Sequence, residues 1–497
     1  MTSLTSLARA LAVQQETAQR ITMVRHTHIS DRPLVFVPLT LAGEANAPLA
    51  ALLGDDRHAP RLLVVPQPRN RDQRFAFAAE LGRIVLSYVD SFARHQEEVP
   101  AKVTRFRFSD APQILVPNPG GVGFVRLFGR STRLRRTYGE YAVPTVVPLL
   151  GRWLTFFAER AEYPGSSLLV PMTSALGAHW ATGQSTVEDA NLAALLAWID
   201  PPAGVSPFDA AIAAEDPEHS PPAGPTTDPT FDAERLAPAI DRYARTDGNP
   251  PARERALALL QDNLRSQLQP TWELMWRGAD LLRKLTPGAH VVDRWAEDRD
   301  AYTNYVNYLN GDNPLPQARR DSAVAAARRL SRLERAQASY DAQRALDDPL
   351  VMAEFRLAGE AFTGTVIAAS PDRIDDSGAR RKLRPRITVR TVDPLRLNDG
   401  REVTSPARPA QRAQILALAP VDGALDVELE LSGGMGRSLT APPGSVPAEG
   451  ELVTYSTVSD AFQPSGQFPE AEDTPWTHGG PPAPATPTEE DAVEAWS

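Results

Sequence analysis

The chain has 497 residues, of which 42% are hydrophobic, and it carries a formal net charge of −10. Single cores rarely grow beyond roughly 250–300 residues, so we expect two or three domains. The absence of cysteine excludes disulfide bonds, thiolate zinc sites, iron–sulfur clusters and cysteine nucleophiles. No run approaches the roughly 20 apolar residues of a membrane-spanning helix, and Met1–Gln15 lacks the features of a signal peptide, so a cytoplasmic protein that binds no membrane is expected.

Residues 1–200 are predicted to form a mixed α/β domain. Short apolar runs bounded by Pro, Gly and Asn indicate strands at Leu34–Leu41, Arg61–Val65, Val103–Phe108, Gln113–Val116 and Val122–Phe128. Apolar residues at helical spacing indicate helices within Phe77–Phe92, Val146–Phe157 and Leu192–Ile199. Asn118–Gly123 lies between two predicted strands and lacks the full dinucleotide fingerprint, so we expect a hairpin turn there.

The remainder of the chain is predicted to hold four further segments. Residues 201–232, with eight prolines and six acidic residues, indicate a linker, and residues 233–357 indicate a helical connector that ends in an arginine-rich helix. In residues 358–462 the hydrophobic period changes to two, and about five predicted strands favour a small OB-like β-barrel. Residues 463–497 form an acidic tail that we expect to be disordered. The fold class is therefore predicted to be multi-domain α+β.

The order of elements between about residues 316 and 460 carries a family resemblance. A charged helix runs into a small barrel that contains the segment Leu397–Val403. In this order the region resembles the helical stalk and β-barrel accessory elements of Upf1-type superfamily 1 helicases. The ATP-hydrolysing motor of a helicase is missing, because no lysine follows a glycine as a phosphate-binding P-loop requires.

The sequence offers little that indicates catalysis. It has no protein-kinase signature, no Gly-x-Ser-x-Gly elbow and no His-Glu-x-x-His helix. His26 and His28 follow the apolar run Ile21–Val24, and a His-x-His at a strand end can place two imidazoles on one metal ion. The alternatives are a metal-dependent hydrolase of unfamiliar type at this pair and ordinary hydrogen-bonded histidines. The leading expectation includes no catalytic residue and no cofactor.

Basic residues gather in two segments despite the negative net charge. Eight basic residues and one acidic residue lie between Lys102 and Arg136, and eleven basic and five acidic residues lie between Arg373 and Arg412. Arginine binds phosphate through two parallel hydrogen bonds and aromatic residues stack on bases, so these segments are predicted to bind nucleic acid. The predicted residues are Arg105, Arg107, Arg126, Arg130, Arg133, Arg135, Arg136, Arg380, Arg381 and Arg384. A solvated face, or pairing with the chain's own acidic segments, is the alternative, and Phe106 and Phe108 are expected to face the core.

The acidic tail contains large apolar residues that a purely solubilising segment does not need. Thr488 with Asp491 forms a potential capping box, so Val493 and Trp496 would share one helical face. Trp476, Val493 and Trp496 are therefore predicted to bind a partner protein. Together these patterns predict a non-enzymatic accessory or scaffold subunit of a multi-protein nucleic-acid-processing complex. A helicase or nuclease would be its partner, DNA or RNA a further ligand, and anti-phage defence one setting.

Overall fold

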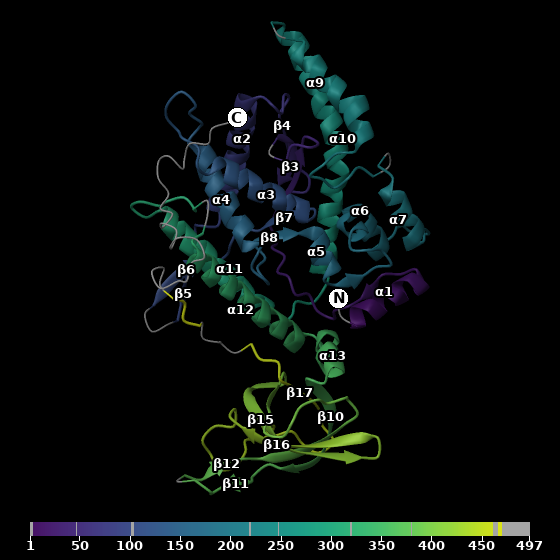
Figure 1. The fold of residues 1–497 in the computed structure, drawn as a ribbon, viewed down its shortest axis with the longest axis vertical. Coiled ribbons are helices and arrows are strands. Elements are labelled where there is room, and N and C mark those ends of the chain that lie inside the picture. Colours follow the sequence, from purple (N-terminus) through teal and green to yellow (C-terminus); the bar gives the residue numbers. More distant parts are fainter. Residues whose placement is uncertain are drawn as a thin grey trace, which may run out of the picture. The chain divides into compact units, whose positions relative to one another are not determined.

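The chain is organised in two compact units. The computed structural model describes residues 3–45, 47–100, 104–217, 220–246, 248–318, 321–378, 380–460 and 466–469. Unit 1 contains the described residues of 1–6, 21–24 and 337–464, and unit 2 contains those of 7–20, 25–336 and 465–497. Figure 1 shows the elements of both units. Each unit therefore takes its residues from separate stretches of the sequence.

Unit 2 is built on a five-stranded sheet with the strand order β4–β3–β2–β7–β8. The strands are β2 (Leu34–Thr40), β3 (Pro48–Gly54), β4 (Arg61–Val64), β7 (Ile114–Val116) and β8 (Leu169–Pro171). Strand β2 is antiparallel to β3 and parallel to β7, which is parallel to β8. The carboxyl ends of β2, β7 and β8 therefore meet at one edge of the sheet. The sheet confirms the predicted α/β character of this part of the chain.

Helices cover both faces of this sheet because its central strands are apolar on both sides. Leu34 and Phe36 of β2 belong to one core cluster, and Val35 and Val37 belong to a second cluster on the opposite face. The first cluster is covered by α2 (Arg71–Asp90), α3 (Pro119–Thr132), α4 (Val146–Arg160) and α11 (Val291–Leu309). The second is covered mainly by α5 (Met172–Gly177), α6 (Leu192–Ile199) and α10 (Pro250–Arg283).

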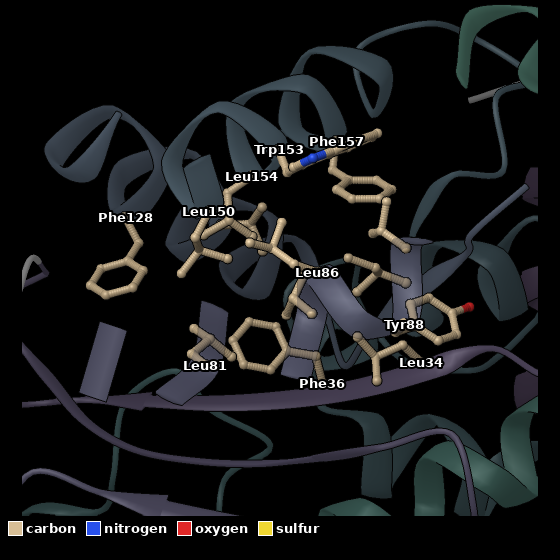
Figure 2. Close-up of a cluster of buried hydrophobic side chains, with 14 of the residues drawn as sticks. Leu34, Phe36, Leu81, Leu86, Tyr88, Phe128, Leu150, Trp153, Leu154 and Phe157 are labelled. Atoms are coloured by element: carbon tan, nitrogen blue, oxygen red, sulfur yellow. The ribbon is translucent and has the colours of Figure 1, made fainter. Parts of the chain in front are cut away.

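Figure 2 shows how the first core cluster is filled. The side chains of Leu34 and Phe36 extend from the sheet toward Leu150 and Leu154 of α4. A layer of helices packed on a β-sheet in this way buries the apolar stripe of each helix against one face of the sheet. The α2, α4 and α6 helices agree with the helices expected from apolar spacing.

Helix α3 corrects one expectation of the sequence. Val122–Phe128 has the apolar composition of a strand, but it lies inside a 14-residue helix. The Asn118 side chain accepts a hydrogen bond from the backbone N–H of Gly121, and Pro119 occupies the first turn, so the expected hairpin turn is a helix N-terminus. A Cβ at Gly121 would lie 2.7 Å from Val116, so the glycine lets the helix begin directly against β7.

The segment that composition predicts to be a linker, residues 201–232, lies within unit 2. It contains α7 (Pro207–Glu215), and its residues Ala211 and Ala223 are buried. Further along, the backbone N–H of Thr40 donates to the carbonyl of Pro225 at 2.7 Å. The Asn118 amide donates to the carbonyl of Gly224 at 3.0 Å. This segment therefore packs at the carboxyl ends of β2 and β7, where open α/β sheets commonly bind their ligands.

Unit 2 has several smaller elements. A separate hairpin is formed by β5 (Gln96–Val99) and β6 (Arg105–Phe108). The remaining elements are α1 (Ser3–Gln15, whose first residues belong to unit 1), β1 (Gln19–Arg20), β9 (Trp180–Ala181), η1 (Glu188–Ala190), α8 (Pro229–Phe231), η2 (Asp232–Leu236) and α9 (Ala237–Ala244). Helix α12 (Ala323–Asp347) is the predicted arginine-rich helix, and its residues are divided between the two units.

Unit 1 contains a closed antiparallel β-barrel, which confirms the small barrel predicted for this region. The strand order is β10–β13–β16–β15–β14–β17. The strands are β10 (Ala361–Ser370), β13 (Arg386–Thr391), β14 (Glu402–Ser405), β15 (Arg408–Val421), β16 (Ala424–Ser432) and β17 (Leu452–Ser456). Five of them were expected, and β14 is the additional one. The sequence pattern does not predict β14, because this strand is short and comes soon after the turn at Asn398–Gly400.

Two further features complete unit 1. A small hairpin of β11 (Ile374–Asp375) and β12 (Lys382–Leu383) lies between β10 and β13 in the sequence. Helix α13 (Pro349–Ala358) begins at Asp348, which is fully buried. Its carboxylate accepts hydrogen bonds from the backbone N–H groups of Leu350, Met23 and Val24. Asp348 thus caps the helix and fixes a distant stretch of chain.

The structure as described is mixed α+β, as predicted. Within the described residues, no helix is both long and apolar enough to cross a membrane. The acidic tail, residues 463–497, lies outside the described residues except for residues 466–469.

Candidate nucleic-acid interface

A close crossing of α3 and α4 sets the position of the predicted arginines. A Cβ at Gly129 of α3 would lie 2.9 Å from the backbone nitrogen of Thr155, and one at Gly151 of α4 would overlap the backbone of Arg133. Glycine at both positions therefore allows the two helices to touch through their backbones. The arginines of α3 therefore lie near Glu159 of α4 and near Glu162, which follows the helix.

Three of the predicted arginines line one cavity. Arg126, Arg130 and Arg133 face a space of about 220 Å³ in unit 2. The other charged residues of its lining are Glu159, Glu162, Asp321 and Arg329. The cavity therefore has four cationic and three anionic side chains, and it is large enough for a phosphate-sized anion.

The three arginines differ in their exposure and in the partners that they already contact. Arg126 forms an ion pair with Glu162 at 3.1 Å, although 44% of its side chain stays exposed. Arg133 is buried and donates to the hydroxyl of Thr155 at 3.3 Å and to the carbonyl of Ala318 at 2.9 Å. Arg130 is exposed, and none of the described carboxylates pairs with it. Arg126 and Arg130 can therefore reach a ligand, whereas Arg133 holds the structure together.

Glu159 makes the charge of the cavity depend on pH. Burial raises the pKa of Glu159, the nearby Arg329 and Arg133 act against this shift, and Glu162 adds to it. Protonation of Glu159 would remove one negative charge from the lining. The cavity is therefore more cationic on the acidic side of the raised pKa.

Arg135 and Arg136 lie in the loop that follows α3. The guanidinium of Arg135 lies 5.6 Å from the ring centroid of Phe75, and that of Arg136 lies 5.7 Å from the ring of Tyr138. Arg71, at the start of α2, lies 5.7 Å from the ring of Tyr141. The prediction from sequence missed both tyrosines and Arg71. A Tyr-x-x-Tyr segment one residue after an Arg-Arg pair, with no hydrophobic period of its own, is the signal that could have indicated the tyrosines.

The two predicted arginines of the β5–β6 hairpin form ion pairs within unit 2. Arg105 pairs with Asp300 of α11 at 2.9 Å, and Arg107 pairs with Glu97 at 2.6 Å. Of the two phenylalanines expected to face the core, Phe108 is buried and Phe106 is 59% exposed. The prediction for Phe106 is therefore wrong, and only Phe108 reaches the core, where its ring centroid lies 5.4 Å from that of Tyr302.

The predicted residues of the barrel region lie on or near the β11–β12 hairpin of unit 1. Arg380, Arg381 and Lys382 are exposed at consecutive positions. Arg384 is half-buried, and its guanidinium donates to the carbonyl of Leu383 at 3.4 Å. The neighbouring Arg373 is paired with Glu430 at 2.8 Å. Unit 1 therefore has a short basic segment of its own.

The two histidines of the His-x-His pair have different surroundings. The backbone N–H of His26 donates to Nε2 of His179 at 3.0 Å, and their ring centroids lie 6.0 Å apart. The ring of His28 stacks on Trp295 with centroids 4.0 Å apart. Burial lowers the pKa of His28 to about 4, and Arg25 adds to the effect. Among the described residues, no three His, Asp or Glu side chains are grouped so that they could hold a metal ion.

Trp476, Val493 and Trp496, the predicted partner-binding residues, lie outside the described residues. Comparisons with protein-family models, with curated proteins and with solved structures find no match to this chain. Its function is therefore inferred from its own residues.

Proposed function

We propose that the protein is a non-enzymatic accessory or scaffold subunit of a multi-protein nucleic-acid-processing complex. The observation that supports this best is the gathering of arginines along α3 and the loop after it. Arg126 and Arg130 line the α3–α4 cavity, and Arg135 and Arg136 follow within six residues. Arginine matches the geometry of phosphate oxygens, so such a surface suits a phosphate backbone.

The same surface accommodates a ligand whose charge is spread out rather than a compact substrate. Its arginines are partly exposed, and the ion pair of Arg126 with Glu162 is of the half-exposed kind that contributes roughly 0–1 kcal/mol. A phosphate can replace such a carboxylate at low cost. This exchange supports reversible, sequence-independent binding.

The proposal also assigns binding roles to the barrel and to the acidic tail. An OB-like barrel with the basic β11–β12 hairpin would hold a second part of the nucleic acid, and Trp476, Val493 and Trp496 would anchor a partner. A helicase or nuclease would provide the chemistry, and an anti-phage defence complex is one setting in which such a subunit works.

The proposal is tested by the salt dependence of nucleic-acid binding. The change is Arg126→Ala with Arg130→Ala, measured against labelled DNA by fluorescence anisotropy between about 50 and 200 mM salt. Each lost phosphate contact lowers the slope of log K against log salt by about one, so we expect a slope smaller by about two and weaker binding at low salt.

Matched variants make this test specific. Arg265 of α10 and Lys284, which directly follows that helix, are exposed, and α10 covers the other core cluster. Arg265→Ala with Lys284→Ala therefore removes the same charge elsewhere and should leave binding unchanged. Arg380→Ala with Arg381→Ala tests the hairpin of unit 1. No binding by the unchanged protein at low salt, or equal binding by all three variants, would contradict the proposal.

A further inference from the structure

Two tyrosines are presented to solvent beside the arginines of the proposed interface. Tyr138 is 58% exposed and Tyr141 is 69% exposed, and both lie in the loop between α3 and α4. Large aromatic side chains lose favourable burial when they stay in water. Two of them within four residues therefore suggest a surface that is covered by a ligand.

The loop that carries the tyrosines is held in one conformation. The backbone N–H of Val143 donates to the carbonyl of Arg136 at 3.0 Å, which closes the loop. Its two ends are anchored because Leu134 and Val143 are buried. Gly139 has φ +86°, a left-handed conformation that other residues rarely adopt, and so permits the tight turn between the tyrosines.

A hydrogen bond also joins this loop to α2. The guanidinium of Arg71 donates to the carbonyl of Tyr141 at 2.6 Å and lies 4.8 Å from the ring centroid of Phe75. Arg71 thus links the backbone of Tyr141 to Phe75, a buried residue of α2. A ligand would find the rings already positioned, which lowers the entropy cost of binding.

Each exposed ring has an arginine beside it. Arg136 lies near Tyr138 and Arg71 near Tyr141, both at 5.7 Å from the ring centroid. The acidic residues nearby in the sequence are Asp72 and Glu140. Asp72 pairs with Arg71 at 3.1 Å but is 89% exposed, so this pair is readily exchanged for a phosphate. Aromatic rings and cations therefore lie close together in this loop and at the start of α2.

We infer that this surface, formed by Tyr138, Tyr141, Arg71 and Arg136, is a stacking platform for unpaired bases. The inference rests on the proposed function and specifies its ligand as a single strand. In a duplex the faces of the bases are covered by their neighbours, whereas in a single strand they can stack on tyrosine while arginines hold the phosphates. Since every base has an aromatic face, binding tolerates any sequence.

The test compares single-stranded with duplex DNA of the same length. The probes are a labelled oligothymidylate of about 15 nucleotides, close to the upper size of one single-strand site, and a labelled duplex of equal length. Tyr138→Ala with Tyr141→Ala is expected to weaken single-strand binding at least about tenfold, because stacking on each ring is lost. Duplex binding is expected to change less than about twofold, since it depends on phosphate contacts.

Two further variants separate stacking from other effects. Tyr138→Phe with Tyr141→Phe keeps both aromatic faces and should bind the single strand like the unchanged protein. Phe106→Ala removes an exposed aromatic residue from the β5–β6 hairpin and should have no effect. The thermal unfolding midpoint of each variant shows whether its fold is retained.

The outcomes distinguish this inference from the proposed function. If the alanine pair leaves single-strand binding unchanged, or weakens single-strand and duplex binding equally, the stacking platform is wrong while a nucleic-acid-binding subunit still stands. If the alanine pair instead loses only a co-purifying protein, the surface binds protein and the inference is wrong, since tyrosine and arginine also dominate protein interfaces. If the unchanged protein binds neither probe, the proposed function itself fails.

Discussion

Buried polar side chains organise the irregular stretch of chain that leads into the sheet. Gln113 accepts a hydrogen bond from the backbone N–H of Ser30 and donates to the carbonyls of His28 and Ser167. One amide side chain thus satisfies backbone groups of a segment that has no strand partner of its own. Buried backbone groups without such partners cost about 1–3 kcal/mol each, so this residue type is required at this position.

His28, in the same stretch, should make stability depend on pH. Its pKa in the folded protein is lowered to about 4 by burial, with Arg25 and Arg299 adding to the shift and Asp31 opposing it. Between about pH 6.5 and 4 the unfolded chain therefore binds a proton that the folded chain does not. The free energy of unfolding falls as pH falls through this window, by at most about 1.4 kcal/mol per pH unit.

The variant His28→Gln should flatten this dependence. We expect a smaller loss of stability between about pH 6.5 and 5 than in the unchanged protein, measured by denaturant unfolding at each pH. His58 is exposed, so His58→Gln is the matched control and should follow the unchanged protein. Equal pH dependence in all three proteins would show that His28 does not titrate in this way.

At the scale of elements, the α3–α4 crossing depends on glycine. Gly129 lies against Thr155 with no room for a Cβ, whereas Gly123 on the same helix has nothing within 4 Å. Gly129→Ala should destabilise unit 2 by about 1–3 kcal/mol, because the helices must separate. Gly123→Ala should instead stabilise it by about 0.5–1 kcal/mol, since alanine favours a helix.

Thermal unfolding of the two variants measures this difference. Arg126 and Arg130 lie on the helix that would move, so Gly129→Ala should also weaken nucleic-acid binding through the altered cavity. Similar unfolding midpoints for the two alanine variants would contradict the close crossing.

The elements that the sequence predicted have a clear hydrophobic pattern. Helices α2 and α4 bury apolar residues at helical spacing, and strand β2 is an apolar run that is buried on both faces of the sheet, so local pattern and tertiary environment agree. Helix α3 was missed because Val122, Phe124, Val125 and Phe128 resemble a short strand when the cap at Asn118 is read as a turn. Composition likewise could not show that the predicted linker segment packs on the sheet edge, because the contacts there are made by the backbone carbonyls of Gly224 and Pro225.

The candidate interface was predictable only in part. Clustered arginines are visible in the sequence, but which of them are paired depends on distant carboxylates. Asp300 of α11 and Glu162, which follows α4, reach Arg105 and Arg126 only through tertiary packing. The tyrosine platform depends on which loop residues stay outside the core, and that is decided by tertiary packing.

At the scale of the whole molecule, Asp348 should be a sensitive position of unit 1. It accepts from the N–H groups of Met23 at 2.6 Å, Val24 at 3.1 Å and Leu350 at 2.9 Å. Asp348→Ala removes a helix cap and leaves three part-buried N–H donors without their acceptor, so we expect a loss of about 3 kcal/mol in the stability of unit 1.

Hydrogen exchange detects this loss locally. Faster exchange is expected at the amides of Met23, Val24 and Leu350, together with a lower unfolding midpoint. Asp376→Ala changes an exposed carboxylate in the same unit and should have little effect. Unchanged exchange at those amides in Asp348→Ala would show that the carboxylate does not hold the segment.

The division of unit 1 over distant parts of the sequence has a consequence for its synthesis on the ribosome. Val24 and Gln337 are about 310 positions apart, yet both belong to unit 1. At about 5–20 residues per second, the residues near Val24 emerge roughly 15–60 s before their partners exist. Unit 2 can fold during that interval, whereas unit 1 must form after translation has passed residue 337. Its early-synthesised residues then need to stay accessible until the barrel has left the ribosomal exit tunnel.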